Sequence, residues 1–275
     1  MVAAAGTGPE PLPEWLAGRP AGPVRIPRGL RPLVGSDPDV VWLNELGGLT
    51  FRLDGAYLKW APRGSGLDLA AEADRLTWAQ QYTPVPEVLD GGADDDGAWL
   101  LTREVPGRSA VDARWLADPV AAVRAAGQGL RALHEALPVD GCPFDWGVPT
   151  RIRASRRRAG ERRAAGLVTP AEESQLARGS AALAALPAPP PVDRLVVCHG
   201  DPCVPNTLID DAGRWTAHVD LGALGVADRW ADLAVATWST VWNYGPGYEA
   251  VLLEAYGIEP EPARTAFYRQ LWDLT

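Results

Sequence analysis

Residues 195–222 read LVVCHGDPCVPNTLIDDAGRWTAHVDLG, and the rest of the chain is organised around this stretch. An apolar strand, LVVC, runs into a polar loop that holds Asp201, and Asn206 follows five positions later. Two short strands joined by the turn DDAG then predict a β-hairpin that ends at Asp220. The hairpin therefore carries Asn206 and Asp220 toward one place.

These three side chains have the types and the order that phosphoryl transfer requires. The reaction needs a carboxylate beside the attacking hydroxyl group and two oxygen ligands that hold Mg²⁺ against the nucleotide phosphates. We assign the first role to Asp201 and the metal-binding role to Asn206 and Asp220. The stretch therefore predicts a site for Mg²⁺ and a nucleoside triphosphate, either ATP or GTP.

The pattern His-Gly-Asp-x₄-Asn at residues 199–206, followed by Asp-Leu-Gly at residues 220–222, resembles the catalytic and metal-binding loops of the aminoglycoside phosphotransferases, relatives of the protein kinases. The resemblance implies a two-lobe α+β fold, with an antiparallel sheet and a helix in the N-lobe and a larger, mainly helical C-lobe. It also implies an ATP-dependent O-phosphotransferase that modifies an aminoglycoside antibiotic and confers resistance. Each fragment alone has a plainer interpretation as a loop after a strand, because Asp, Asn and Gly are common in turns.

Composition is that of a globular protein. The chain has 275 residues, 47% hydrophobic and 22% charged, which is long enough for two lobes around a cleft. No apolar run is long enough to span a membrane, and the N-terminus lacks the basic and apolar regions of a secretory signal. The three cysteines have no framework spacing, which fits a reducing compartment. We therefore expect a cytoplasmic protein.

The charge balance constrains the partners. A net charge of −9 argues against nucleic acid and favours a cationic small molecule. We expect no membrane contact and a monomer or weak dimer. Residues 151–163 contain seven arginines, which indicates either a phosphate patch or a solvated helix face, and the net charge favours the solvated face.

Three segments follow from the sequence pattern. Residues 1–39 form an arm rich in Pro, Gly and Ala, which we expect to be mobile or loosely packed. Residues 40–105 form a nucleotide-binding N-lobe, because short apolar runs separated by Gly-Gly and Asp-Gly predict an antiparallel meander. Residues 106–275 form a mainly helical lobe for catalysis and substrate binding.

Lys59, near the end of the third predicted strand, is the only lysine among 26 basic residues. In a chain so biased toward arginine, one lysine indicates a place that needs a compact ammonium group, although it can also be a random remnant. The family resemblance implies that Lys59 binds the nucleotide phosphates and that Glu72, on the following helix, orients Lys59. The rival for Glu72 is a surface pair with Arg75.

Two backbone segments are candidates for further nucleotide contacts. The Gly47-Gly48 turn between the first two strands would lie over the nucleotide, although it is not a Gly-x-Gly-x-x-Gly loop. The chain leaves the N-lobe through a hinge at residues 104–107, and the backbone from Arg103 to Val105 is placed to hydrogen-bond an adenine edge.

Other residues are assigned a supporting role. Asp232 is expected to turn inward and accept hydrogen bonds from the catalytic-loop backbone, and His199 of the same loop belongs to this support. His134 is expected to be structural, since it has no partner nearby in sequence. A zinc site is rejected, because the adjacent strand residues Cys198 and His199 point to opposite faces.

The acceptor site is the least determined part. Family members that modify kanamycin and neomycin at the 3′ position carry acidic residues near the C-terminus, and the resemblance extends this role to Asp273 and to the carboxylate of Thr275. Glu172 and Glu173 are the nearest acids in the segment that supplies carboxylates in the family. The 3′ class is our first assignment and a streptomycin 3″-phosphotransferase the alternative. A kinase of another small hydroxylated metabolite and a nucleotide-binding protein without catalysis are the rival classes.

Overall fold

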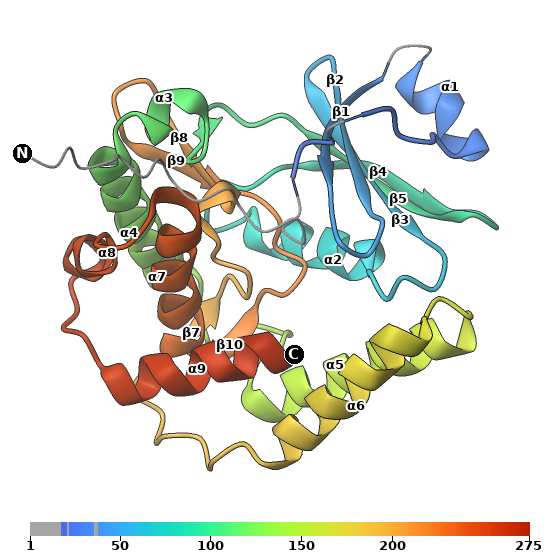
Figure 1. Cartoon of the computed structure of the whole chain (residues 1–275). Helices are drawn as coiled ribbons and strands as arrows, with labels where there is room; N and C mark the ends of the chain where they lie inside the picture. Colours follow the sequence, from blue (N-terminus) through green and yellow to red (C-terminus); the bar gives the residue numbers. More distant parts are fainter. Residues whose placement is uncertain (1–17, 21, 36–37) are drawn as a thin grey trace, which may run out of the picture.

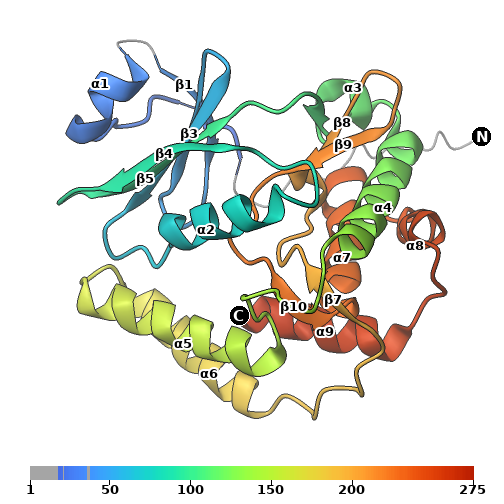
Figure 2. The same cartoon turned by 180° about the vertical axis from the view of Figure 1, so that it is seen from behind.

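The computed structural model describes residues 18–20, 22–35 and 38–275, which fold into two lobes (Figures 1 and 2). The predicted α+β class and two-lobe arrangement are confirmed. The N-lobe elements are η1 (Arg28–Leu30), α1 (Arg31–Val34), β1 (Asp39–Leu43), β2 (Leu49–Leu53), β3 (Ala56–Pro62), α2 (Leu69–Ala79), β4 (Val88–Ala93) and β5 (Gly97–Arg103). The C-lobe elements are β6 (Arg108–Ser109), α3 (Ala113–Leu116), α4 (Pro119–Ala136), α5 (Val148–Ala164), α6 (Pro170–Ala184), β7 (Leu195–Cys198), η2 (Val204–Asn206), β8 (Thr207–Ile209), β9 (Trp215–His218), β10 (Gly225–Asp228), α7 (Trp230–Tyr244), α8 (Glu249–Tyr256) and α9 (Pro262–Leu274).

The N-lobe sheet places Lys59 on its central strand. The strand order is β1-β2-β3-β5-β4, and every neighbouring pair is antiparallel. The predicted turns before β2 and β3 hold Gly47 and Gly55 at φ values of 83° and 67°, a left-handed conformation that glycine adopts without steric cost. On β3, Lys59 lies opposite Thr50 of β2 and Leu100 of β5.

Helix α2 packs against this sheet and carries Glu72 into the interior. Asp68 caps the helix by accepting the amide of Ala71 at 3.0 Å. The helix ends at Ala79. Glu72 lies on the same buried face as Leu76, with 5% of its surface exposed. A carboxylate in this environment requires a charged partner.

The described part of the N-terminal arm packs against the N-lobe. Gly18 pairs with Leu43 in an isolated β-bridge, and Leu30 and Val34 are buried in one cluster with Phe51. The expectation of a loosely packed arm is therefore wrong for residues 28–34, because their apolar side chains cover the sheet. The rest of that expectation, on residues 1–17, 21 and 36–37, lies outside the described residues.

The C-lobe core forms around helices α4, α7, α8 and α9. Helix α4 packs along α8, and α7 packs against α9. One leucine from each helix is completely buried: Leu133, Leu233, Leu252 and Leu271. This core supports the two small sheets that carry the catalytic loop.

Two short sheets hold the stretch from residue 195 to residue 222. Strand β7 pairs with β10, and the predicted hairpin forms from β8 and β9, with β6 on its other edge. Helices α5 and α6 form a separate hairpin, which lies beneath the N-lobe in Figure 2. It contacts the N-lobe loop after β3, because a Cβ atom placed on Gly64 would lie 2.5 Å from the Cβ of Ala165.

Candidate active site

Lys59 joins the two lobes through two carboxylates. Its Nζ lies 2.6 Å from Oε1 of Glu72 on α2 and 2.7 Å from Oδ1 of Asp220, which follows β9. Burial lowers the pKa of Lys59, but the charges of Asp220 and Glu72 outweigh it, so the net pKa is raised and the amine stays protonated. The arrangement presents a fixed cation at the point where N-lobe and C-lobe meet.

The alternative pairing of Glu72 does not form. Arg75 instead donates from Nε to the carbonyl of Leu224 and from Nη1 to the carbonyl of Ala71, both at 2.9 Å. Glu72 is thus left to Lys59, which is the geometry that the sequence predicted.

The catalytic loop runs from β7 through η2. Burial and the charge of Asp220 raise the pKa of Asp201, and its Oδ1 is buried without a hydrogen-bond partner among the described residues. Asn206 donates from its side-chain Nδ2 to the main-chain carbonyl of Asp201 at 3.0 Å. The main-chain carbonyl of Asn206 accepts the amide of Val219 at 3.0 Å. The amide group of Asn206 is therefore oriented with its side-chain oxygen left for another ligand.

Asp220 has an unusual backbone conformation. Its φ of 68° lies in the left-handed region, and within the described ranges no other non-glycine residue has a positive φ. This conformation costs an L-residue about 1 kcal/mol or more and persists only where surrounding contacts hold it. Here the bond to Lys59 and the end of β9 fix the residue, so that Oδ1 of its carboxylate contacts the N-lobe while 48% of the side chain stays exposed.

Asp232 holds the start of the catalytic loop. Its carboxylate, at the beginning of α7, accepts the amide of His199 at 2.6 Å and the amide of Gly200 at 3.0 Å. Gly200 has a φ of 85°, and a Cβ atom there would lie 2.2 Å from the carbonyl oxygen of Ala223, so only glycine fits. The inward turn predicted for Asp232 is present.

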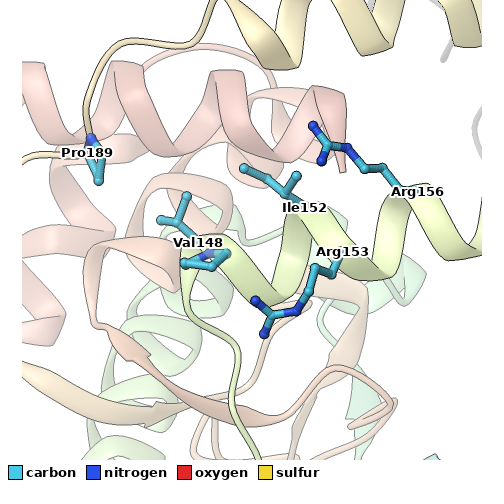
Figure 3. Close-up of a pocket in the computed structure, with 6 residues that line it drawn as sticks. Val148, Ile152, Arg153, Arg156 and Pro189 are labelled. Carbon is cyan, nitrogen blue, oxygen red and sulfur yellow. The ribbon is translucent and has the colours of Figure 1, made fainter.

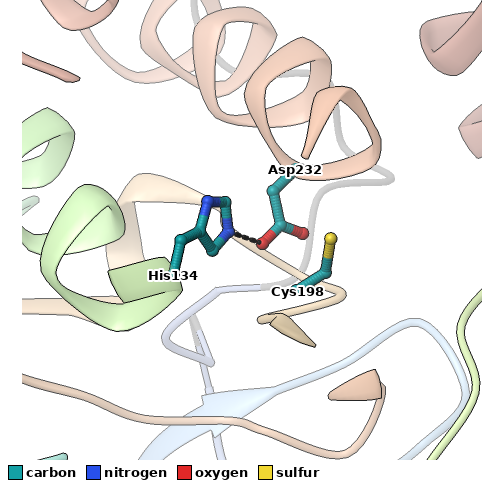
Figure 4. A group of neighbouring side chains, drawn as sticks. All are labelled: His134, Cys198 and Asp232. Carbon is teal, nitrogen blue, oxygen red and sulfur yellow. Dashed lines mark hydrogen bonds and ion pairs between the residues drawn. The ribbon is translucent and has the colours of Figure 1, made fainter. Parts of the chain in front are cut away.

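His134 and Tyr256 connect to this support, and neither was predicted as part of it. His134 contributes Nε2, 2.9 Å from Oδ2 of Asp232 (Figure 4). Its Nδ1 lies 2.8 Å from the hydroxyl of Tyr256. His199 accepts the amide of Asp201 at its Nδ1, at 3.3 Å. His134 is structural, as expected from its isolated position. Its partner Tyr256 is 122 positions away, so no local pattern revealed the contact.

His134, Cys198 and Asp232 lie close enough together to suggest a metal site (Figure 4). Both ring nitrogens of His134 and both oxygens of Asp232 already have protein partners. Burial raises the pKa of the Cys198 thiol well above its usual range, so it stays protonated. The cluster is a structural network rather than a metal site.

The predicted Gly47-Gly48 turn is held by Asn44. The Oδ1 of Asn44 accepts the amides of Leu46, at 3.0 Å, and Gly48, at 2.7 Å. Strand β2 follows at once, and its Thr50 is the register partner of Lys59. The turn therefore lies at the same end of the sheet as Lys59.

At the hinge, the two predicted backbone candidates differ. The amide of Arg103 already donates to the carbonyl of Glu87 at 2.8 Å, and its side chain pairs with Glu87 at the surface. The backbone of Val105 has no partner among the described residues. Val105 therefore remains the hinge candidate for a contact with the base.

Glu172 and Glu173 are committed to the α5–α6 hairpin. Glu172 closes a capping box with Thr169 and pairs with Arg162 at 3.2 Å. Glu173 pairs with Arg163 at 2.8 Å. Figure 1 shows that α6 begins at the outer tip of the hairpin. The structure does not bring either carboxylate to the catalytic loop, which argues against their predicted part in binding the acceptor.

The end of α9 is anchored on α5. Arg151 donates from Nη2 to the hydroxyl of Thr275 at 3.1 Å, and Arg158 contacts the main-chain oxygen of Thr275. Asp273 is exposed at the same end of the helix. Of the two predicted C-terminal groups, Asp273 is thus the one with an accessible carboxylate.

The seven arginines of residues 151–163 are largely accounted for within the fold. Arg157, Arg162 and Arg163 pair with glutamates of the hairpin. Arg151 is buried between the rings of Trp146 and Trp272, with its Cζ 5.2 and 5.9 Å from their centroids. The paired arginines agree with the solvated helix face that the net charge predicts. Arg151 does not agree with that prediction, because its side chain lies in the core.

A hollow at the start of α5 is separate from the candidate active site. Figure 3 shows its six lining residues, which are Val148, Pro149, Ile152, Arg153, Arg156 and Pro189. None of these residues belongs to the loop or the strand that hold the functional side chains.

Within the part of the chain that the structure describes, no helix is long and apolar enough to cross a membrane.

Comparison with known proteins adds independent observations. A model of the phosphotransferase enzyme family matches residues 29–268. The chain is 41% identical over 229 residues to an aminoglycoside 3′-phosphotransferase of Streptomyces fradiae, covering 78% of this chain and 84% of the relative. It is 38% identical over 262 residues to streptomycin 3″-kinase of Streptomyces griseus, covering 88% and 93%. An aminoglycoside phosphotransferase of class 3″-Id from Streptomyces rimosus, solved with ADP and streptomycin, superposes with a TM-score of 0.64 at 31% identity, covering 90% of this chain and 96% of that chain.

Proposed function

The chain belongs to the phosphotransferase enzyme family, and we propose that it transfers the γ-phosphoryl group of ATP to a hydroxyl of an aminoglycoside antibiotic and thereby confers resistance. The observation that carries this proposal is the pair of short contacts from Lys59 to Glu72 and Asp220, which assembles a phosphate-binding cation from both lobes. Phosphoryl transfer depends mainly on positioning and on charge stabilisation, and this group supplies both.

Asp201 is the proposed base. Its Oδ1 is buried and free of protein partners among the described residues, so it is the atom that accepts the proton of an incoming hydroxyl. The raised pKa makes the carboxylate a better proton acceptor than an exposed aspartate. The bonds from Asp232 to the preceding amides keep the loop backbone fixed while the substrate binds.

Asn206 and Asp220 fit the Mg²⁺ that such a reaction uses. Mg²⁺ prefers oxygen ligands, and the two residues offer an amide oxygen and a carboxylate. Asn206 Nδ2 donates to the carbonyl of Asp201, and the remaining amide oxygen accepts no hydrogen bond from the described residues, which suits a ligand role. When bound, Mg²⁺ neutralises negative charge on the phosphates.

The nucleotide is proposed to lie beneath the Gly47-Gly48 turn. Lys59 faces its α- and β-phosphates, and the Val105 backbone lies at its base. ADP in the Streptomyces rimosus structure supports ATP as the donor for this chain. GTP is the alternative, and competition between the two nucleotides in the assay decides between them.

For the acceptor we propose the 3′ hydroxyl of a kanamycin- or neomycin-type aminoglycoside. The support is the 41% identity with the Streptomyces fradiae 3′-phosphotransferase, and a net charge of −9 suits a cationic substrate. Streptomycin is the second candidate acceptor. It is favoured by the match to streptomycin 3″-kinase, which covers 88% of this chain.

One experiment separates these acceptors. Release of ADP is measured with ATP and kanamycin, neomycin, streptomycin or several unrelated sugars, and any product is analysed by NMR. Phosphorylation at the 3′ position of kanamycin or neomycin supports the first assignment, and phosphorylation at the 3″ position of streptomycin replaces it. Turnover only with unrelated hydroxylated metabolites contradicts the aminoglycoside assignment.

A further inference from the structure

Helix α7 touches the middle of the catalytic loop through one buried hydroxyl group. Ser239 is completely buried, and its Oγ accepts the amide of Val204 at 3.0 Å. Val204 lies between Asp201, the proposed base, and Asn206, the proposed metal ligand. The contact therefore supports the loop at a point that lies between the two functional side chains in the sequence.

A second residue of α7 orients this hydroxyl. Asn243, one helical turn later, donates from Nδ2 to the carbonyl of Ser239 at 2.8 Å and to its Oγ at 3.2 Å. A serine hydroxyl has two acceptor lone pairs and one donor hydrogen. Because Val204 and Asn243 take both lone pairs, the hydrogen is left to donate.

Ser239 differs from the other buried hydroxyl residues of the helix. A Ser or Thr inside a helix commonly bonds back to a carbonyl of the preceding turn. Thr237 does so with Leu233 at 2.7 Å, and Thr240 does so with Thr237 at 2.7 Å. Ser239 instead bonds outward to the loop, so this hydroxyl serves the loop rather than the helix.

We propose that Ser239, braced by Asn243, is a positioning residue that holds the loop from Asp201 to Asn206 in the geometry of phosphoryl transfer. The proposal rests on the proposed function, since it refines the same site. Positioning matters because a displacement of about 1 Å between reacting groups lowers the rate about 10²-fold. Removal of the hydroxyl leaves the Val204 amide without its acceptor and allows the loop to shift.

The test compares Ser239→Ala with Thr240→Val, a matched control that also removes a buried hydroxyl from α7. For each variant kcat, KM for ATP, KM for the acceptor and Tm are measured. We expect Ser239→Ala to lower kcat on the order of tenfold or more with KM for ATP changed less than about twofold. Thr240→Val lowers Tm and keeps kcat. Ser239→Thr retains the oxygen and restores most of the lost turnover.

Asn243→Ala keeps the proposal testable where Ser239→Ala does not fold. It removes the brace but not the hydroxyl, and we expect kcat to fall about threefold or more, again with KM for ATP nearly unchanged. Wild-type kcat in a folded Ser239→Ala variant, or an equal loss of kcat in Thr240→Val, overturns the positioning role. The wild-type enzyme is assayed alongside, so that failure of the proposed function shows as no acceptor turnover in any sample.

Discussion

Lys59 and Asp220 are separated by 161 positions in the sequence, and the ammonium group of Lys59 lies 2.7 Å from Oδ1 of Asp220. Glu72 holds the same ammonium from the other side at 2.6 Å. A cation from the N-lobe sheet and a carboxylate from the C-lobe hairpin thus meet at one point. Because the reaction transfers a phosphoryl group from a nucleotide to an acceptor, this contact between the lobes defines where the phosphates are expected to lie.

Replacement of Lys59 tests the phosphate-binding role. We expect Lys59→Arg and Lys59→Ala to raise KM for ATP alike, by about tenfold or more, because a planar guanidinium placed between two carboxylates does not reproduce a compact ammonium. Arg52→Ala is the control, since Arg52 is also an N-lobe cation paired with a carboxylate but is exposed. A Lys59→Arg enzyme with the wild-type KM for ATP would mean that Lys59 serves only as a generic charge.

The metal assignment predicts a specific change in Mg²⁺ dependence. Asn206→Ala and Asp220→Ala each remove an oxygen ligand, so both raise the Mg²⁺ concentration needed for half-maximal activity. Asp211→Ala, on the exposed turn of the same hairpin, leaves the titration unchanged. If the Mg²⁺ titrations of the first two variants match that of the wild-type enzyme, the metal lies elsewhere.

Asp232 is predicted to matter for stability. It is completely buried and holds the His199 and Gly200 amides as well as His134. Loss of one partner of a buried charged network costs about 3 to 5 kcal/mol, so Asp232→Ala should lower the free energy of unfolding by that amount in a urea titration. An unchanged unfolding midpoint would contradict the supporting role.

The same residue predicts a dependence of stability on pH. Burial raises the pKa of Asp232, but His134 and the other groups around the carboxylate outweigh it, and the net pKa is lowered. The contribution of Asp232 to folding is therefore fully present above its unfolded pKa of about 3.9 and is lost as pH falls through the lower folded value. Asp232→Asn should remove this part of the acid sensitivity. If the acid unfolding curves of the wild-type protein and of Asp232→Asn have the same slope below pH 4, Asp232 does not contribute to the acid sensitivity.

Substitutions at the end of α9 distinguish two interpretations of this segment, namely acceptor binding and packing of the lobe. Asp273→Asn should raise KM for the aminoglycoside about tenfold, with KM for ATP and Tm little changed, and added salt should weaken acceptor binding to the intact enzyme. Thr275→Val should instead lower Tm, because Thr275 anchors α9 on Arg151. If Asp273→Asn changes only Tm, the tail packs the lobe and does not bind the substrate.

The local sequence pattern was sufficient to predict the catalytic loop, because the strand, the loop and the hairpin follow one another within a single stretch from residue 195 to residue 222. The orientation of Glu72 toward Lys59 also follows from neighbouring elements, since β3 and α2 are adjacent in the chain. The bond between Lys59 and Asp220 depends on how the lobes meet, and no spacing in the sequence encodes it. Val204 and Ser239 are also brought together only by the packing of α7.

Two of the wrong expectations, the acceptor role of Glu172 and the loosely packed arm, have different origins. The capping box of Thr169 and Glu172 was readable in the sequence as Thr-x-x-Glu before a helix, and it would have assigned Glu172 to helix capping. The burial of Leu30 and Val34 was not readable, because two apolar residues in a proline-rich segment do not show which surface they cover. Prolines exclude a long helix, but they do not prevent packing against a sheet.

The most direct test is phosphorylation of the acceptor by the wild-type enzyme and by Asp201→Asn, an almost isosteric change at the proposed base. Both proteins are incubated with ATP, Mg²⁺ and the aminoglycoside that the screen identifies, and the phosphorylated product is quantified together with nucleotide affinity. We predict that the wild-type enzyme forms one phosphate ester, and that Asp201→Asn lowers kcat on the order of 10²-fold or more while it binds ATP with nearly wild-type affinity. Near wild-type turnover by Asp201→Asn would contradict the assignment of Asp201 as the group that accepts the hydroxyl proton.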